Sequence, residues 1–155
     1  MVKKIKQLNL NPLSVAKFFY EKGVEIFPIN QQLIYFTCLE AMKENYLLFN
    51  EEWQAWPNGP ALKSVIDEMY DNRDKLKSFF KPIENIDNEL VLNWAEKTFK
   101  KYKNTEQYLL FEKAQNKPWK DARKPLKTER EIGKITLNSL LNYTHKNNSR
   151  QFKTV

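Results

Sequence analysis

Hydrophobic residues recur along most of the chain at the three- and four-residue spacing of amphipathic helices. The clearest such stripe contains Leu62, Val65, Ile66, Met69 and Tyr70. Pro60 is predicted to be the first residue of this helix, a position where the missing N–H of proline has no partner to lose. Comparable stripes, opened by N-cap residues such as Asn11, Asn30, Asn88, Thr105 and Thr136 or closed by Gly or Pro, predict helices over residues 12–22, 30–45, 87–103, 105–115 and 136–143. Residues 76–80 and 119–123 each predict a single short turn.

Two stretches do not follow the helical period. Residues 46–56 alternate roughly every second position and predict a strand, and 132–135 predict a short extended piece. Pro57-Asn58-Gly59-Pro60 is a turn signal. The sequence therefore predicts a mainly α, single compact domain of about six or seven helices with a small β element. Within it Trp56 is expected to be buried, and Trp53, which has polar neighbours on both sides, to be more exposed.

Composition narrows the possible chemistry. A chain of 155 residues, 41% hydrophobic and 14% aromatic, is long and apolar enough for one folded domain rather than a disordered chain. Cys38 is the only cysteine and lies on a helical apolar stripe, so it is expected to be a core residue rather than a nucleophile. His145 is the only histidine and falls in the polar C-terminal stretch. No catalytic residue, metal site or cofactor is predicted, so a non-enzymatic binding protein is expected. The absence of a signal or membrane-spanning stretch predicts a cytoplasmic location.

Positive charge is concentrated in the C-terminal third of the chain. The net charge is +7, which divides into −3 for residues 1–96 and +10 for residues 97–155. This field could attract an acidic protein or nucleic acid. Of the 26 basic residues 22 are lysines, which lack the bidentate fork that arginine uses to read bases. A solvated face or a protein-partner face is therefore favoured over a nucleic-acid-binding region between Lys97 and Lys153.

Five segments carry more specific motifs. The segment INQQLIYFTCLEAM contains Leu33, Tyr35 and Phe36, and LLFNEEWQAWPNGPAL contains Ala55-Trp56 followed by Gly59-Pro60. The helix after this turn closes on Tyr70, NKPWKDAR contains Pro118, Trp119, Ala122 and Arg123, and ITLNSLLNYT ends the series. In this order they resemble the Panacea domain, an antitoxin domain also found in phage-associated proteins and in SocA-like antitoxins. The resemblance covers residues 12–145 and leaves 1–11 as an N-terminal lead-in and 146–155 as a polar tail.

The resemblance implies a function in a toxin–antitoxin pair. The expected activity is neutralisation of a cognate protein toxin, encoded by the adjacent gene, through direct stoichiometric binding. A proteolytic adaptor that delivers the toxin to a cytoplasmic protease is an alternative, and a nucleic-acid-binding regulator is a third. The motif residues are expected to be mostly structural, and Glu52 and Trp53 are the candidate partner contacts. Lys113-Ala114 stands where the family usually has a threonine-histidine pair, so any role of that histidine is absent here.

Overall fold

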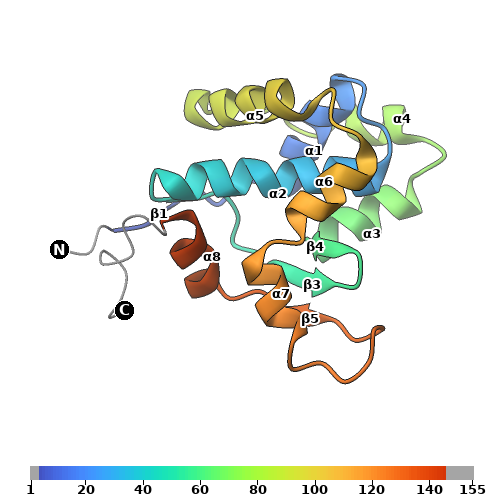
Figure 1. Ribbon diagram of the computed structural model, residues 1–155. Coiled ribbons are helices and arrows are strands. Elements are labelled where there is room, and N and C mark those ends of the chain that lie inside the picture. The colour runs from blue at the N-terminus through green and yellow to red at the C-terminus, as the bar shows by residue number, and fades with distance from the viewer. Residues whose placement is uncertain (1–3, 146–155) are drawn as a thin grey trace.

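The computed structural model describes residues 4–145, which form eight helices and five short strands (Figure 1). The helices are α1 Pro12–Glu21, α2 Phe27–Lys43, α3 Lys63–Asp71, α4 Leu76–Phe80, α5 Glu89–Tyr102, α6 Gln107–Ala114, α7 Lys117–Arg123 and α8 Leu137–Thr144. The strands are β1 Lys6–Gln7, β2 Tyr46–Leu47, β3 Gln54–Trp56, β4 Gly59–Ala61 and β5 Gly133–Lys134. The predicted mainly α, single-domain fold is confirmed. The helix number exceeds six or seven because α4 and α7, each less than two full turns long, form complete helices.

Helix α2 is the centre of the core. It contacts α1, α3, α5, α6 and α8, and in Figure 1 it crosses the molecule between α5 on one side and the three-stranded sheet on the other. Every residue from Asn30 to Leu39 is buried. A helix covered on all sides needs hydrophobic residues around its whole circumference rather than along one face. This explains why the apolar stripe seen in the sequence described only part of the buried surface.

The beginning of α2 differs from the prediction. The helix starts at Phe27 rather than after an Asn30 cap, because Pro28 lies in the first turn, where a proline needs no N–H partner. Asn30 instead lies inside the helix and is completely buried. Its Nδ2 donates to the carbonyl oxygens of Ala16 (3.0 Å) and Val24 (3.3 Å), which ties α2 to α1 and the loop after it.

The predicted turn joins two strands rather than a strand and a helix. Strands β4, β3 and β5 form an antiparallel sheet in that order, and Trp56 pairs with Gly59, which leaves residues 57–58 as a two-residue hairpin turn. Gly59 has a φ of +148°, which side chains rarely tolerate. Pro60 belongs to β4, an edge strand, where a missing N–H is tolerated. The expectation that Pro60 opens the next helix is therefore wrong, and α3 begins at Lys63.

The segment treated as a lead-in contributes to the fold. Lys6 and Gln7 of β1 pair in parallel with Tyr46 and Leu47 of β2. Ile5, Leu8 and Leu10 pack against the core from this segment. The protein therefore contains more strand than the sequence predicts. The β1–β2 pairing joins positions about forty residues apart, so no local turn signal marks it in the sequence.

Tyr70 and His145 have environments that differ from the prediction. Tyr70, part of the predicted apolar stripe, is 51% exposed, and the Arg73 guanidinium lies 4.2 Å from its ring centre. Helix α3 buries only Val65 and Met69. His145 is buried, with Nε2 2.6 Å from the carbonyl oxygen of Met42, so it belongs to the packed domain and not to a polar tail. The predicted tail, residues 146–155, lies outside the described residues.

Candidate functional site

The two most specific motifs of the sequence meet in the structure. The indole Nε1 of Trp119 on α7 donates to the carbonyl oxygen of Trp56 on β3 at 2.8 Å. The Arg123 guanidinium donates to the carbonyl oxygen of Ala55 at 2.9 Å. These residues are 63 and 68 positions apart in the chain, so α7 and β3 form one unit through side chain to backbone bonds.

Arg123 organises the loop between α7 and β5. Besides Ala55, it donates to the carbonyl oxygens of Glu129 (3.0 Å) and Glu131. The planar guanidinium presents several N–H groups in a fixed geometry, which allows one side chain to hold three carbonyls. The packing beneath it is tight, because a Cβ on Gly133 would lie 2.6 Å from the carbonyl oxygen of Ala122.

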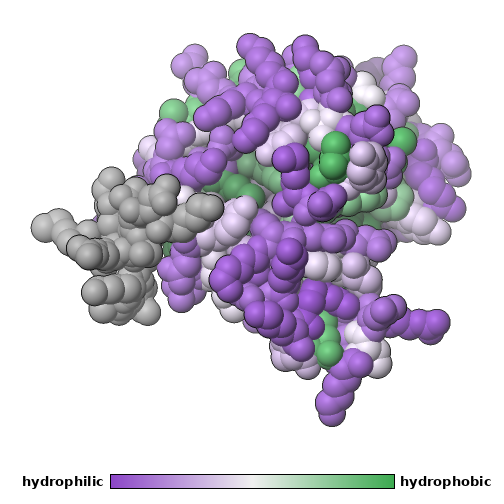
Figure 2. Space-filling view, viewed as in Figure 1, coloured by the Kyte–Doolittle hydropathy of each residue, from purple (hydrophilic) through white to green (hydrophobic). Residues whose placement is uncertain are grey.

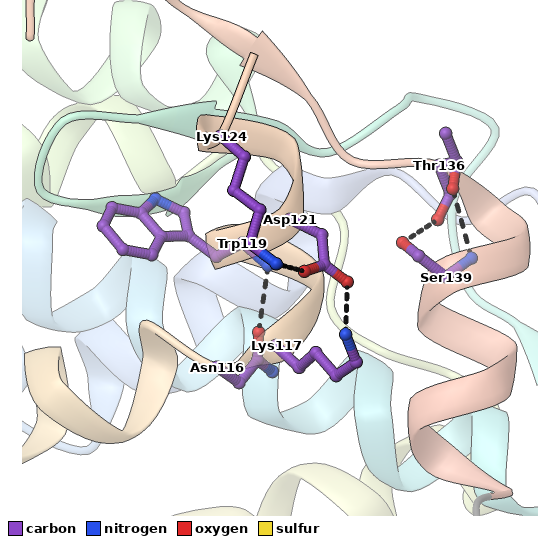
Figure 3. A network of polar contacts seen from close by, with 7 residues as sticks. All are labelled: Asn116, Lys117, Trp119, Asp121, Lys124, Thr136 and Ser139. Atoms are coloured by element: carbon purple, nitrogen blue, oxygen red, sulfur yellow. Dashed lines mark hydrogen bonds and ion pairs between the residues drawn. The ribbon is translucent and has the colours of Figure 1, made fainter. Parts of the chain in front are cut away.

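Asn116 connects this unit to α2. Its Oδ1 accepts hydrogen bonds from the Tyr35 hydroxyl (3.0 Å) and from the backbone N–H of Trp119 (3.3 Å), the second of which caps α7 (Figure 3). Tyr35 is completely buried, and burial raises the pKa of its hydroxyl far above the usual value although the bond to Asn116 acts in the opposite direction. Tyr35 is therefore a neutral donor that fixes the orientation of the Asn116 amide.

The exposed side of α7 carries an ion-pair chain. Asp121 accepts from Lys117 (2.8 Å) and Lys124 (3.1 Å), as Figure 3 shows. Hydrogen bonds from these two ammonium groups lower the pKa of the Asp121 carboxyl. Both lysines are well exposed, so these pairs contribute little to stability. Their main effect is to hold the two ammonium groups beside the Asp121 carboxylate.

The exposures of the two hairpin tryptophans are the reverse of those expected. Trp53 is only 4% exposed and packs edge-to-face on Tyr35, with 4.9 Å between ring centres. Trp56 is half-buried, and its Nε1 donates to Oε1 of Gln54 at 2.7 Å. Side chains alternate along an extended chain, so Trp53 and Ala55 share the core face, and Gln54 and Trp56 share the other. The alternation was evident in the sequence, but it was assigned to the wrong face.

The remaining candidate residues divide by exposure. Glu52 is exposed and pairs with Lys134 at 3.1 Å, beside a cavity of about 460 Å³ that Trp53 also lines. Buried motif residues are Tyr35, Phe36, Gly59, Pro60 and Pro118, and half-buried ones are Trp56, Trp119, Ala122 and Arg123. Cys38 lines the same cavity but is buried, and burial raises the pKa of its thiol, as expected for a core cysteine.

A second concave surface was not anticipated from the sequence. A groove of about 750 Å³ lies where α2, α5, α6, α7 and α8 meet. Six lysines line it, namely Lys43, Lys97, Lys101, Lys113, Lys117 and Lys120. In Figure 2 hydrophilic side chains surround a recess between α5 and α7–α8 that has hydrophobic side chains at its bottom. The helical spacing of Lys97 with Lys101 on α5, and of Lys117 with Lys120 on α7, is the signal in the sequence, but the sequence does not show that these helices face each other.

Comparisons with family models, curated proteins and solved structures found no match. The resemblance to the Panacea domain therefore depends on the motif residues alone. Among residues 4–145, no helix is both long and apolar enough to cross a bilayer. In the same part of the chain, no three His, Cys, Asp or Glu side chains are grouped so that they could hold a metal ion.

Proposed function

We propose that the protein is an antitoxin that neutralises a protein toxin by direct stoichiometric binding, without catalytic turnover. The observation that carries the proposal is the junction of the Ala-Trp/Gly-Pro hairpin with the Pro-Trp-x-x-Ala-Arg helix through Trp119 and Arg123. Residues that are singled out only by their resemblance to one family are joined by hydrogen bonds between α7 and β3. This supports the view that they act together as a family motif.

The proposed contact surface is the outer side of this hairpin. Glu52 is exposed and Trp56 is half-buried, whereas Pro57 and Asn58 at the turn are exposed. A partly exposed tryptophan beside exposed polar groups is typical of protein-binding surfaces, in which aromatic side chains provide most of the binding energy. Trp53 lies underneath and supports this surface, so it is no longer a candidate for direct contact.

A co-expression growth assay tests the proposal. The gene adjacent to this one is expressed alone and together with the full chain, and rescue of growth is expected only in the second case. Glu52→Lys reverses an exposed charge at the contact surface and is expected to reduce rescue. Glu84→Lys makes the same change at an exposed position outside this surface and is expected to leave rescue intact. A neighbour that is not toxic, or equal rescue by both variants, would contradict the proposal or the surface, respectively.

The same strains separate neutralisation from proteolytic delivery. A neutralising antitoxin leaves the half-life of the toxin unchanged or lengthens it, because the bound toxin is protected from unfolding. An adaptor shortens that half-life, and the effect disappears when the cytoplasmic protease is deleted. The toxin half-life after translation is blocked, with and without this protein, decides between the two.

A further inference from the structure

We propose that the lysine-lined groove binds a small molecule that carries two or more adjacent phosphate groups. The groove is distinct from the hairpin surface of the proposed function, since none of Glu52, Trp56, Pro57 or Asn58 lines it. Its volume of about 750 Å³ is within the range of about 300–1,000 Å³ that small-molecule sites occupy.

The first argument is the charge of the groove. Only two carboxylates, Glu40 and Glu112, line it together with the six lysines. Glu40 is occupied by Lys43 (2.9 Å) and Lys97 (3.2 Å). A concave surface of one sign concentrates the electrostatic potential and raises the local concentration of ions of the opposite sign. With six lysines and two carboxylates in its lining, the groove carries a net positive charge.

Three of the lysines remain available for a ligand. Within residues 4–145, Lys101, Lys113 and Lys120 form no ion pair, and they come from α5, α6 and α7 respectively. Like charges that face one cavity repel each other, which a bound anion would relieve. Lysine ammonium groups bind phosphate as point charges and do not need the planar geometry that arginine provides.

The second argument is a buried donor without an acceptor. Asn116 lines the groove and is only 8% exposed. Its Oδ1 already accepts hydrogen bonds from Tyr35 and Trp119, which fixes the orientation of the amide. The amide nitrogen Nδ2 takes part in neither bond. Nδ2 is buried and has no hydrogen-bond partner among the described residues. An N–H donor of this kind needs an acceptor, and a phosphate oxygen provides one.

Thr98 provides a second unsatisfied group on the wall of the groove. It is 1% exposed, and its Oγ1 has no hydrogen-bond partner within the described residues. The floor nearby is aromatic, since the rings of Phe36 and Tyr102 stack with 4.5 Å between their centres. Buried polar groups, exposed lysines and an aromatic floor together fit an oligophosphate, either free or attached to a flat ring.

Isothermal titration calorimetry on the full chain tests this proposal with inorganic triphosphate and ATP as probes. Both are expected to bind with a stoichiometry of one. ATP that binds more tightly than triphosphate indicates that the aromatic floor accepts the base, and equal affinities indicate that the phosphates alone are recognised. The double variant Lys101→Gln/Lys113→Gln is expected to weaken binding at least about tenfold. The control Lys75→Gln/Lys77→Gln removes the same net charge at exposed positions outside the groove and should change the affinity less than about twofold.

Asn116→Asp distinguishes a ligand role from a structural one. The aspartate keeps the oxygen that accepts from Tyr35 and Trp119 and caps a helix as well as asparagine does, but it replaces the Nδ2 donor with a negative charge. The buried carboxylate is expected to lower the melting temperature. Triphosphate binding is therefore measured on the folded variant, well below its melting temperature, where it should fall more than about tenfold. If this variant does not fold, the lysine double variant and its control still decide the question.

Three results would overturn the proposal. The first is no measurable binding of triphosphate or ATP by the full chain, and the second is an equal loss in the groove and control lysine variants, which would reveal only diffuse charge attraction. The third is tighter binding of a glutamate-rich peptide or of a single-stranded oligonucleotide than of triphosphate, since either would assign the groove to a macromolecule. None of these results depends on toxin neutralisation, so the two proposals fail independently.

Discussion

Trp53 and Trp56 lie three positions apart but have opposite environments, because a strand turns successive side chains to opposite faces. Trp53 fills the core against Tyr35, whereas Trp56 remains half-exposed. The sequence shows the alternation but cannot show which face meets α2, because both faces carry a tryptophan. The packing of the sheet against α2 determines that choice.

Truncation of these two tryptophans is expected to separate stability from binding. Trp53→Ala should lower the free energy of unfolding by about 3–5 kcal/mol through lost burial and a cavity. Trp56→Ala removes a half-buried side chain and should cost about 1–2 kcal/mol. Denaturant unfolding of both variants measures the difference, and toxin pull-down is expected to fail for folded Trp56→Ala. A Trp53→Ala protein that unfolds like the unchanged chain would refute the described core.

The thiol of Cys38 should be inert in the folded protein. The side chain is 3% exposed, and burial raises its pKa, so neither access nor the thiolate needed for reaction is provided. Ellman's reagent at pH 8 is expected to react at least about a hundredfold more slowly than with the chain unfolded in guanidinium. Rapid reaction without denaturant would show that the cavity beside Trp53 opens to the solvent.

At the scale of elements, α7 packs directly on β5 because residue 133 has no side chain. Gly133→Ala would place a Cβ 2.6 Å from the carbonyl oxygen of Ala122, so α7 must move, and the expected cost is about 2–3 kcal/mol. Gly23→Ala is the control: no atom lies within 4 Å of its Cβ, and only the positive φ of +98° is unfavourable, at about 1 kcal/mol. Chemical denaturation of both variants measures the two costs. Equal costs would indicate that α7 and β5 are not in contact in solution.

The elements that the sequence predicted best have local determinants. Asn11, Asn88 and Thr136 were assigned as N-caps, and each accepts a hydrogen bond from a backbone N–H of the helix that follows it. Asn30 and Pro60 were assigned wrongly because each residue type fits more than one local structure. An asparagine can cap a helix or bond within a core, and a proline can open a helix or sit in an edge strand. Tertiary contacts determine the outcome, and these are not local.

At the scale of the whole molecule, the contrast between an acidic N-terminal portion and a basic C-terminal portion becomes a spatial feature. Lysines from α2, α5, α6 and α7 surround one groove. Basic residues that are separate in the sequence therefore contribute to a positive potential at one place on the surface. Asn116 belongs both to the motif junction and to the groove, because it caps α7 at Trp119 and lines the groove. The sequence could identify the charges and the motif separately, but not their common residue.

Glu40 controls how much of that positive field is available, and its titration gives a pH-dependent prediction. Burial alone would raise the pKa of the carboxyl, but hydrogen bonds from Lys43 and Lys97 outweigh it, and the pKa in the folded protein lies below the usual value. A group with a lowered pKa in the folded state stabilises the protein above its unfolded pKa of about 4.3, and this contribution is lost as the pH falls through the folded value.

Glu40→Gln should therefore be less stable than the unchanged chain at pH 7, by up to about 1 kcal/mol, and the difference should shrink as the pH falls below the unfolded pKa of about 4.3. The substitution also releases Lys43 and Lys97 into the groove, so triphosphate should bind more tightly to the variant at pH 7 even though its fold is weaker. Urea unfolding from pH 3 to pH 7 and calorimetric titration measure the two effects. Opposite signs of the stability and affinity changes are the expected signature, because the same two lysines stabilise the fold when paired and attract the ligand when released. A variant that loses stability and affinity together would show that Glu40 shapes the groove rather than competes for its charges.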